Sequence, residues 1–221
     1  MYPELCTACN ELLKESEATI CTQCQAILPK TEDWESQTSD TFHQFNSLYP
    51  CSIVSSFLYL SKNSKVEHLL YQLKYRGKYE IGYLLGFLYG KALADSSQFT
   101  AYEYEWIIPV PLHKKRLKKR GYNQSKAISE GLSAATGISI NEDICKRIHA
   151  TRSQTFKDKF SRIHDMDSVF KVVKPELLTK GCNVLIVDDV ITTGATIDAL
   201  CKHLYETGLI QYFGILSIAK K

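Results

Sequence analysis

One segment, residues 183–197, constrains the fold of this chain more than any other. Residues 184–187 are aliphatic, and such a short run, apolar on both faces, is typical of a central strand in a parallel sheet. Asp188 and Asp189 (the acid pair) end the predicted strand. After a polar loop, apolar residues recur at intervals of three and four, which predicts a helix, and residues 212–219 form a second apolar run. This order predicts a right-handed parallel crossover of strand, loop, helix and strand.

The loop of this unit has the composition of a phosphate-binding turn. Gly194 lets the backbone come close to a ligand, and the free N–H groups and the dipole at the start of the next helix favour an anion there. Thr192, Thr193 and Thr196 add hydroxyl donors. The carboxylates of the acid pair suit the vicinal hydroxyls of a ribose and could help to hold Mg²⁺ through water. The segment predicts a site for a phosphorylated ribose; the alternative is an ordinary turn capped by threonines, with the acids serving that turn.

The length and composition fit one folded α/β domain with a small appendage. The chain has 221 residues, of which 44% are hydrophobic and 23% charged, so it can bury a core. Its net charge of +3 does not by itself favour a nucleic-acid partner. No signal peptide is expected, and the longest apolar stretch, residues 81–93, is too short to span a bilayer. We therefore expect a soluble cytoplasmic protein without a disulfide framework.

The N-terminal cysteines have the spacing of a zinc site. Two Cys-x-x-Cys pairs, Cys6 with Cys9 and Cys21 with Cys24, suit a tetrahedral, structural zinc ion. The segment has few apolar residues, so the metal would supply its folding free energy, on the order of 10 kcal/mol. The alternatives are a redox dithiol and a chance spacing. Cys201 lies on the apolar face of the last predicted helix and is expected in the core.

The sequence divides into three parts. We expect a zinc knuckle in residues 1–30, a linker or irregular cover in the polar residues 31–52, and the main α/β domain in residues 53–221. Apolar patterns predict further strands at residues 53–60 and 106–111, and helices at residues 66–73, 79–93 and 125–136. In the helix over 79–93, the side chains expected to face the core are those of Leu84, Leu85, Leu88 and Tyr89.

A dense basic segment follows the strand that ends in prolines. Six of the seven residues from 114 to 120 are Lys or Arg. Charges this dense repel one another unless an anion or solvent meets them. Both a ligand site and a solvated helix face are therefore possible interpretations, and the same holds for the cations of residues 74–78.

The phosphate-type loop also carries a family resemblance. Val-Asp-Asp-Val-Ile-Thr-Thr-Gly-Ala-Thr resembles the loop that binds phosphoribosyl pyrophosphate (PRPP) in type I phosphoribosyltransferases. The resemblance implies the α/β fold of that family, with a central parallel sheet, helices on both faces and a small hood. It also implies that the acid pair contacts the ribose hydroxyls and that the threonine-rich loop holds the 5′-phosphate. The PRPP-binding residues implied here are Asp188, Asp189, Val190, Thr192, Thr193, Gly194, Ala195 and Thr196.

Further motifs resemble one subfamily. The pattern Pro-Val-Pro-Leu-x-x-x-Arg-x-x-x-Arg-Gly-Tyr-Asn-Gln, at residues 109–124, is similar to that of the ComF proteins of bacterial competence. These proteins join an N-terminal zinc knuckle to a phosphoribosyltransferase-like domain. Leu-Lys-Tyr-Arg-Gly at residues 73–77 also matches, and Asp165 stands where the family usually has Asn. A last motif consists of Arg147, Thr151, Gln154, Arg162 and Phe170.

The resemblance implies roles for the basic region and for cofactors. Arg116 and Arg120, together with the acid pair, are the implied catalytic residues. Residues 147–168 correspond to a mobile loop that closes over the site. The implied cofactors are structural zinc and Mg²⁺ bound with PRPP. The pyrophosphate loop would consist of Val110, Pro111, Leu112 and His113.

Two functions of different classes stay open at the level of the sequence. One is a phosphoribosyltransferase that works by positioning PRPP and stabilising the leaving pyrophosphate, in DNA uptake or nucleotide metabolism. The other is an accessory factor without turnover, whose zinc knuckle and basic stretch bind single-stranded DNA and meet a DNA-uptake helicase. A redox zinc protein is a weaker third interpretation, since no thiol motif adjoins the phosphate loop.

Overall fold

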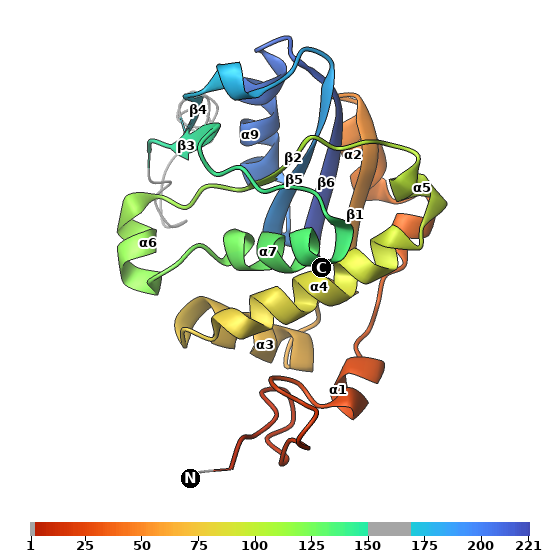
Figure 1. The fold of residues 1–221 in the computed structure, drawn as a ribbon, viewed down its shortest axis with the longest axis vertical. Coiled ribbons are helices and arrows are strands. Elements are labelled where there is room, and N and C mark those ends of the chain that lie inside the picture. Colours follow the sequence, from red (N-terminus) through yellow and green to blue (C-terminus); the bar gives the residue numbers. More distant parts are fainter. Residues whose placement is uncertain (1–2, 150–168) are drawn as a thin grey trace.

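The computed structural model describes residues 3–149 and 169–221, and a four-stranded sheet forms its centre (Figure 1). All neighbouring strands in this sheet are parallel. In spatial order they are β1 (Cys51–Tyr59), β6 (Ile210–Lys220), β5 (Cys182–Ile191) and β2 (Trp106–Pro109). The predicted parallel sheet is therefore confirmed, and β5, which carries the acid pair, is an interior strand.

Strand β5 continues through the acid pair, whereas the sequence predicted that the acids end it. Asp188 pairs with Ser217 of β6, and Ile191 pairs with Lys220. The pairing extends because β6 is itself long enough to satisfy the backbone groups of β5 beyond the acids. The side chains of Val184 and Ile186 enter one core cluster and those of the alternating positions enter another, so the sheet has a core on each face.

Helices α4 (Tyr79–Ala94) and α7 (Gln124–Thr136) cover the first face of the sheet. They approach each other closely: a Cβ added at Gly86 would lie 2.1 Å from the carbonyl oxygen of Ile128, and one at Gly131 would lie 2.0 Å from that of Tyr83. Only glycine fits such backbone contact. Helix α3 (Lys65–Tyr75) joins the same core through residues that include Leu69 and Leu73.

The buried face of α4 differs from the prediction in part. Leu85 and Tyr89 are fully buried, as expected, but Leu84 and Leu88 are only partly buried. The close contact of the glycine side of α4 with α7 turns these two leucines to the margin of the interface. The fully buried apolar side chains of α4 instead recur every four residues, at Ile81, Leu85, Tyr89 and Leu93.

Helices α2 (Asp40–Asn46) and α9 (Ala195–Tyr205) pack on the second face. Phe45 and Leu200 are fully buried there, as is Cys201, whose place in the core was predicted. The sheet thus has helices on both faces, as the sequence predicted.

Residues 31–52, for which we expected a linker or an irregular cover, contain the short helix η1 (Asp33–Glu35) and helix α2. Trp34 is buried, with its ring centroid 5.8 Å from that of Phe57 and 5.6 Å from that of Tyr89. Strand β1 also begins two residues earlier than predicted, at Cys51. The side chains of Trp34, Phe42 and Phe45 account for the difference, because they are buried in the two cores.

The N-terminal segment folds against the α3 end of the molecule (Figure 1). It contains helix α1 (Thr22–Ala26), and the buried side chains of Ile20 and Leu28 belong to the same core cluster as those of α3. The remaining elements are α5 (Ser97–Thr100), α6 (Lys114–Arg120), η2 (Pro175–Leu177) and the antiparallel pair β3 (Cys145–Arg147) and β4 (Phe170–Val172). None of the helices in residues 3–149 and 169–221 is both long and apolar enough to cross a membrane.

Candidate functional site

A cleft of about 490 Å³ lies at the end of β5 that carries the acid pair. Ligand sites of α/β proteins commonly lie at this carboxyl edge of a parallel sheet, where loops from several strands meet. The residues that line the cleft come from α3, α6, α7, α9, β3 and β5 and from the loops after β1, β2 and β5. Of the predicted site residues, those that line it are Val110, Pro111, Leu112, Arg116, Arg120, Asp188, Asp189, Val190, Thr192 and Thr196.

The acid pair is held by contacts from two helices. The hydroxyl of Ser125, in the first turn of α7, donates to Asp188 Oδ1 at 3.0 Å, and the backbone N–H of Asp189 donates to the same oxygen at 2.8 Å. Lys74, near the end of α3, contacts Asp189 Oδ1 through its Nζ at 2.9 Å. The side chain of Asp189 is 14% exposed and that of Lys74 21%, so this ion pair is shielded on most sides.

Burial, and after it the neighbouring charge of Asp189, raise the pKa of Asp188 to about 7. The hydrogen bonds from the Asp189 N–H and from Ser125, and the charge of Lys74, act in the opposite direction without cancelling the effect. Asp188 therefore keeps its proton up to near neutral pH. A ligand that donates hydroxyl groups, or a cation, would favour the ionised form of Asp188.

The loop after β5 gives Gly194 a structural role that the sequence did not suggest. Its φ of +76° is in the left-handed region, and an added Cβ would lie 2.8 Å from the ring of Phe45 in α2. The side-chain amide of Gln44 donates to the Thr193 carbonyl at 3.3 Å, so α2 fixes this turn. Thr192 and Thr196 face the cleft, whereas Thr193, Gly194 and Ala195 are not among its lining residues. We expected Gly194 to make room for a ligand, but it makes room for Phe45.

The loop after β2 is anchored to the start of α7. The Asn123 side-chain amide donates to the carbonyl of Val110 at 3.1 Å. His113, expected in the pyrophosphate loop, does not line the cleft; its Nδ1 accepts a hydrogen bond from the backbone N–H of Lys115 at 3.2 Å and caps α6. The loop before α6 thus contributes its first three predicted residues to the cleft, and the fourth starts the helix.

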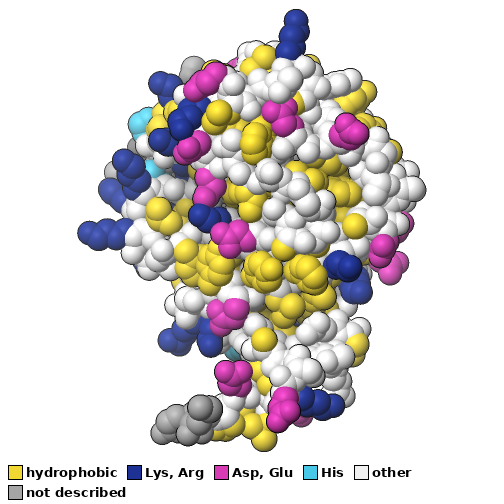
Figure 2. All heavy atoms as spheres, viewed as in Figure 1, with side chains coloured by type: hydrophobic (Ala, Val, Ile, Leu, Met, Phe, Trp, Pro, Cys, Tyr) yellow, Lys and Arg dark blue, Asp and Glu magenta, His cyan; other side chains and the backbone are white. Residues whose placement is uncertain are grey.

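Helix α6 divides its cations between the cleft and the surface. Arg116 and Arg120, one turn apart, line the cleft, and Arg120 Nη1 donates to Gln124 Oε1 at 2.7 Å. The four lysines of α6 are exposed and do not line it. Figure 2 shows Lys and Arg side chains gathered at the edge that α6 occupies in Figure 1.

Among the cleft residues that sequence reasoning left without a committed role are Lys74, Ser125 and Arg147. The sequence did indicate two of them, because Lys74 and Arg147 belong to the subfamily motifs. Burial lowers the pKa of Arg147, as does the nearby charge of Arg116, while Asp188 opposes the shift. Of the predicted mobile loop, residues 150–168 lie outside the described residues, and with them Thr151, Gln154, Arg162 and Asp165.

The four N-terminal cysteines come together in one cluster. The sulfur atoms of Cys6, Cys9, Cys21 and Cys24 all lie within 4.8 Å of one another. The backbone N–H of Cys21 donates to Cys6 Sγ at 3.2 Å, that of Cys24 donates to Cys21 Sγ at 3.4 Å, and Lys65 Nζ donates to Cys24 Sγ at 3.3 Å. These donors favour thiolates and set the sulfurs in the arrangement that a metal ion needs.

The pKa values of the cluster also suit a cation. Burial alone would raise the pKa of Cys6, but backbone N–H donors lower it to about 7. The pKa of Cys9 is raised to about 12: the backbone at Glu11 lowers it, but burial and the other three sulfurs outweigh that effect. Four crowded sulfurs cannot all ionise without a positive charge among them, so the cluster fits a divalent ion bound by thiolates.

Comparison with curated proteins identifies relatives with competence-related names. The chain is 35% identical to Competence protein F of Haemophilus influenzae over 113 residues, which cover 50% of this chain and 49% of that protein. It is 24% identical over 216 residues to Competence protein ComFC of Bacillus subtilis, covering 93% of this chain and 79% of that protein. The resemblance to ComF proteins is confirmed. No protein-family model matches the chain.

A third relative is the DNA utilization protein YhgH of Escherichia coli K12, 32% identical over 102 residues. The match covers 46% of this chain and 44% of that protein, so the chain spans about half the length of YhgH and of Competence protein F. Among solved structures, similar chains include adenine phosphoribosyltransferase from Saccharomyces cerevisiae (TM-score 0.37, 16% identity, 66% of this chain and 69% of that one). Another is glutamine PRPP amidotransferase from Bacillus subtilis (TM-score 0.44, 20% identity, 67% and 30%).

Proposed function

We propose that the cleft binds PRPP, or a closely related ribose phosphate, and that the chain is a phosphoribosyltransferase-like protein. One observation carries the proposal: a single cleft joins a pair of carboxylates to cations from three separate elements, Lys74 of α3, Arg116 of α6 and Arg147 of β3. A ribose needs acceptors for its hydroxyls, and a pyrophosphate needs several cations. Few other small ligands use both groups at once.

Each part of the cleft would contact one part of PRPP. The acid pair would accept hydrogen bonds from the two ribose hydroxyls. Thr192, Thr196 and the N–H groups at the start of α9 would bind the 5′-phosphate. Arg116 and Arg120 would bind the pyrophosphate as bidentate donors. Mg²⁺, when bound with PRPP, would neutralise part of the pyrophosphate charge, and the acid pair is the group that fits it.

The reaction that these groups support is phosphoribosyl transfer. The bond from the ribose to pyrophosphate breaks, and the acceptor forms a new bond at the same carbon. The side chains do no covalent chemistry; the arginines stabilise charge that develops on the leaving group, and the acid pair holds the ribose in position. The rate enhancement would come from the charges of these side chains, because the fold holds them in place before the reaction begins.

Calorimetry with PRPP and with ribose 5-phosphate tests the binding step. We expect the parent protein to bind PRPP in the presence of Mg²⁺, and the double variant Asp188→Asn, Asp189→Asn to bind it at least tenfold more weakly, because neutral amides accept weaker hydrogen bonds than carboxylates. Pyrophosphate release in the presence of a panel of acceptors then tests turnover. Unchanged affinity in the double variant would remove the central assignment.

We also infer that the cysteine cluster holds one structural zinc ion and that the protein is cytoplasmic. Four sulfurs within 4.8 Å of one another support the first point, because an all-thiolate set of four suits zinc. Eight free cysteines support the second, because the cytosol keeps thiols reduced. Metal analysis of freshly purified protein tests the zinc assignment.

The relatives named for competence and DNA utilization suggest a role in DNA uptake. A specific observation favours a second candidate within that role, an accessory factor that binds single-stranded DNA: the four lysines of α6 are exposed and stand outside the cleft. They are free to contact a phosphate backbone while Arg116 and Arg120 serve the cleft, and a DNA-uptake helicase would be the partner. Lys118→Ala with Lys119→Ala should flatten the salt dependence of DNA affinity without changing PRPP affinity.

A further inference from the structure

Two exposed tyrosines stand side by side on α3 at the rim of the cleft. Tyr71 is 47% exposed and Tyr75 is 56% exposed, and their ring centroids are 5.2 Å apart. Both side chains line the cleft. Rings this exposed contribute little to the core, and an aromatic patch that borders a cleft is typical of a surface that contacts a ligand.

Each of the two rings has a guanidinium group beside it. Arg76 lies 6.0 Å from the centroid of Tyr71, and Arg120 lies 5.5 Å from that of Tyr75. Arg120 is held by its hydrogen bond to Gln124, so the cation beside Tyr75 is fixed in place. The surface therefore combines stackable rings with positive charge.

The same helix links the rings to the acid pair. The residues of α3 that line the cleft form one helical face: Glu67, Leu70, Tyr71, Lys74 and Tyr75. Lys74 contacts the acid pair at 2.9 Å, and Tyr75 is its neighbour in sequence. The cleft of about 490 Å³ is within the size range of small-molecule sites, so one ligand can touch both the acids and the rings.

We propose that Tyr71 and Tyr75 form a stacking site for a nucleobase. The base belongs either to a small acceptor or nucleotide in the cleft, or to a nucleic-acid strand that passes over its rim. For the small ligand, the proposal rests on the proposed function, because the ribose phosphate at the acid pair sets where the base lies. It names the class of the second ligand as a planar base, in contrast to a small amine such as ammonia.

A base suits this surface better than the other ligands that a cleft rim can receive. An apolar side chain of a protein partner would gain nothing from the two guanidinium groups, and a bare phosphate would gain nothing from the rings. A base attached to its sugar phosphate uses both, because every base has a π face that stacks on tyrosine, while its phosphate is attracted to Arg120.

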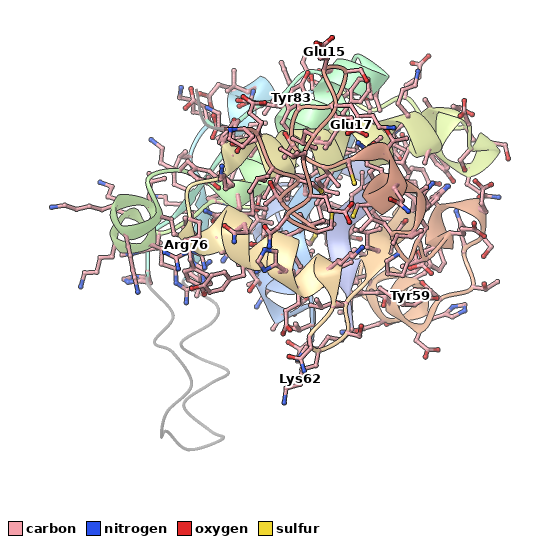
Figure 3. The ribbon with its side chains drawn as sticks, turned by 90° about the horizontal axis from the view of Figure 1, so that it is seen from below. Glu15, Glu17, Tyr59, Lys62, Arg76 and Tyr83 are labelled. Carbon is pink, nitrogen blue, oxygen red and sulfur yellow. The ribbon has the colours of Figure 1, made fainter. Side chains whose placement is uncertain are left out.

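The experiment compares ligands that differ only in the base. Adenosine 5′-monophosphate is compared with ribose 5-phosphate, and a ten-residue oligothymidylate is compared with an abasic oligomer of the same length. The test variant is Tyr71→Leu with Tyr75→Leu, and the conservative variant is Tyr71→Phe with Tyr75→Phe. The matched control is Tyr83→Leu, a tyrosine of α4 that is 42% exposed and lies outside the cleft. Figure 3 labels Tyr83 and Arg76 at well-separated places on the surface.

We expect the leucine variant to bind at least one base-containing probe roughly 5- to 100-fold more weakly than the parent, the range expected for the loss of base stacking. Binding of the matched ligand without a base should stay within about twofold, and the phenylalanine and Tyr83 variants should behave like the parent. A loss confined to the mononucleotide assigns the site to a small ligand, and a loss confined to the oligonucleotide assigns it to nucleic acid.

Two results would overturn the proposal. In the first, the parent protein binds each base-containing probe no better than the matched ligand without a base. In the second, the leucine variant binds all probes with the affinity of the parent. If the parent binds neither PRPP nor ribose 5-phosphate, the proposed function fails. The oligonucleotide comparison then decides the stacking site alone.

Discussion

The raised pKa of Asp188 predicts that the parent protein loses stability relative to Asp188→Asn as the pH rises from about 4 to about 7. In the folded protein Asp188 keeps its proton up to about pH 7, against an ordinary value of 3.8 for the unfolded chain. Between these values unfolding releases a proton, so raising the pH favours the unfolded state. The asparagine has no proton to release, and its side-chain oxygen can still accept the hydrogen bond from Ser125.

The size of the stability difference follows from the difference between the folded and unfolded pKa values of Asp188. A difference of roughly 3 pKa units corresponds to about 4 kcal/mol, at 1.36 kcal/mol per unit. Asp188 lies at the wall of a cleft that water enters, which relaxes part of the penalty, so we expect about 2–4 kcal/mol. For a chain of this length, that amounts to a difference of roughly 5–15 °C in the midpoint of thermal unfolding.

Urea unfolding followed by circular dichroism at pH 4.5, 6 and 8 measures the effect. The quantity of interest is the free energy of unfolding of Asp188→Asn minus that of the parent, because other titrating groups largely cancel in this difference. We expect the difference to grow in favour of the variant from pH 4.5 to pH 8. The control is Asp95→Asn, which removes an exposed carboxylate at the end of α4.

A difference that is independent of pH for Asp188→Asn would refute this reasoning, because it would mean that Asp188 titrates in the folded protein as it does in the unfolded chain. The functional counterpart is a trade-off. The variant should be more stable than the parent at pH 8 yet bind ribose 5-phosphate more weakly, as expected where a binding site stores electrostatic strain.

Three further predictions concern other parts of the molecule. Gly194→Ala should destabilise the fold by about 2–4 kcal/mol, because the backbone is left-handed and the added methyl group would collide with the ring of Phe45. Gly208→Ala, at a φ of +67° with open space around it, should cost only about 1 kcal/mol. Equal losses of stability in thermal unfolding would contradict the collision. Arg116→Ala with Arg120→Ala should weaken PRPP binding at least tenfold and leave ribose 5-phosphate binding nearly unchanged, and calorimetry that shows equal losses would argue against their role at the pyrophosphate. Cys21→Ser should lower the zinc content below one ion per chain and lower thermal stability, and metal analysis that finds zinc retained would exclude Cys21 as a ligand.

Features set by neighbours in the chain were predictable from the sequence. The aliphatic run of β5 lies buried in the interior of the sheet, and α9 follows because apolar residues recur with its helical period. The two Cys-x-x-Cys pairs bring four sulfurs together because each pair spans one tight turn. In these cases the spacing of residues in the sequence directly sets which side chains lie on the same face of an element or at the same turn.

Features set by contacts between distant segments were not predictable. The buried side of α4 was misjudged in part because the contact with α7 is made by backbone at Gly86 and Gly131, and hydrophobic periodicity does not register glycine packing. The packing of Gly194 against Phe45 was likewise not predicted, because Phe45 lies in a segment whose composition resembles a polar linker.

The sequence by itself determined the buried strand β5, the loop and helix α9 that follow it, and the two Cys-x-x-Cys pairs, because each depends on residues close together in the chain. Only the tertiary structure decided what shares the cleft. It set Lys74 against Asp189, grouped Arg147 with Arg116, and left Tyr71 and Tyr75 exposed at the rim. The physical reason is that desolvation and charge–charge energies depend on distance in space, and the fold alone fixes which charges and rings lie within reach of one another.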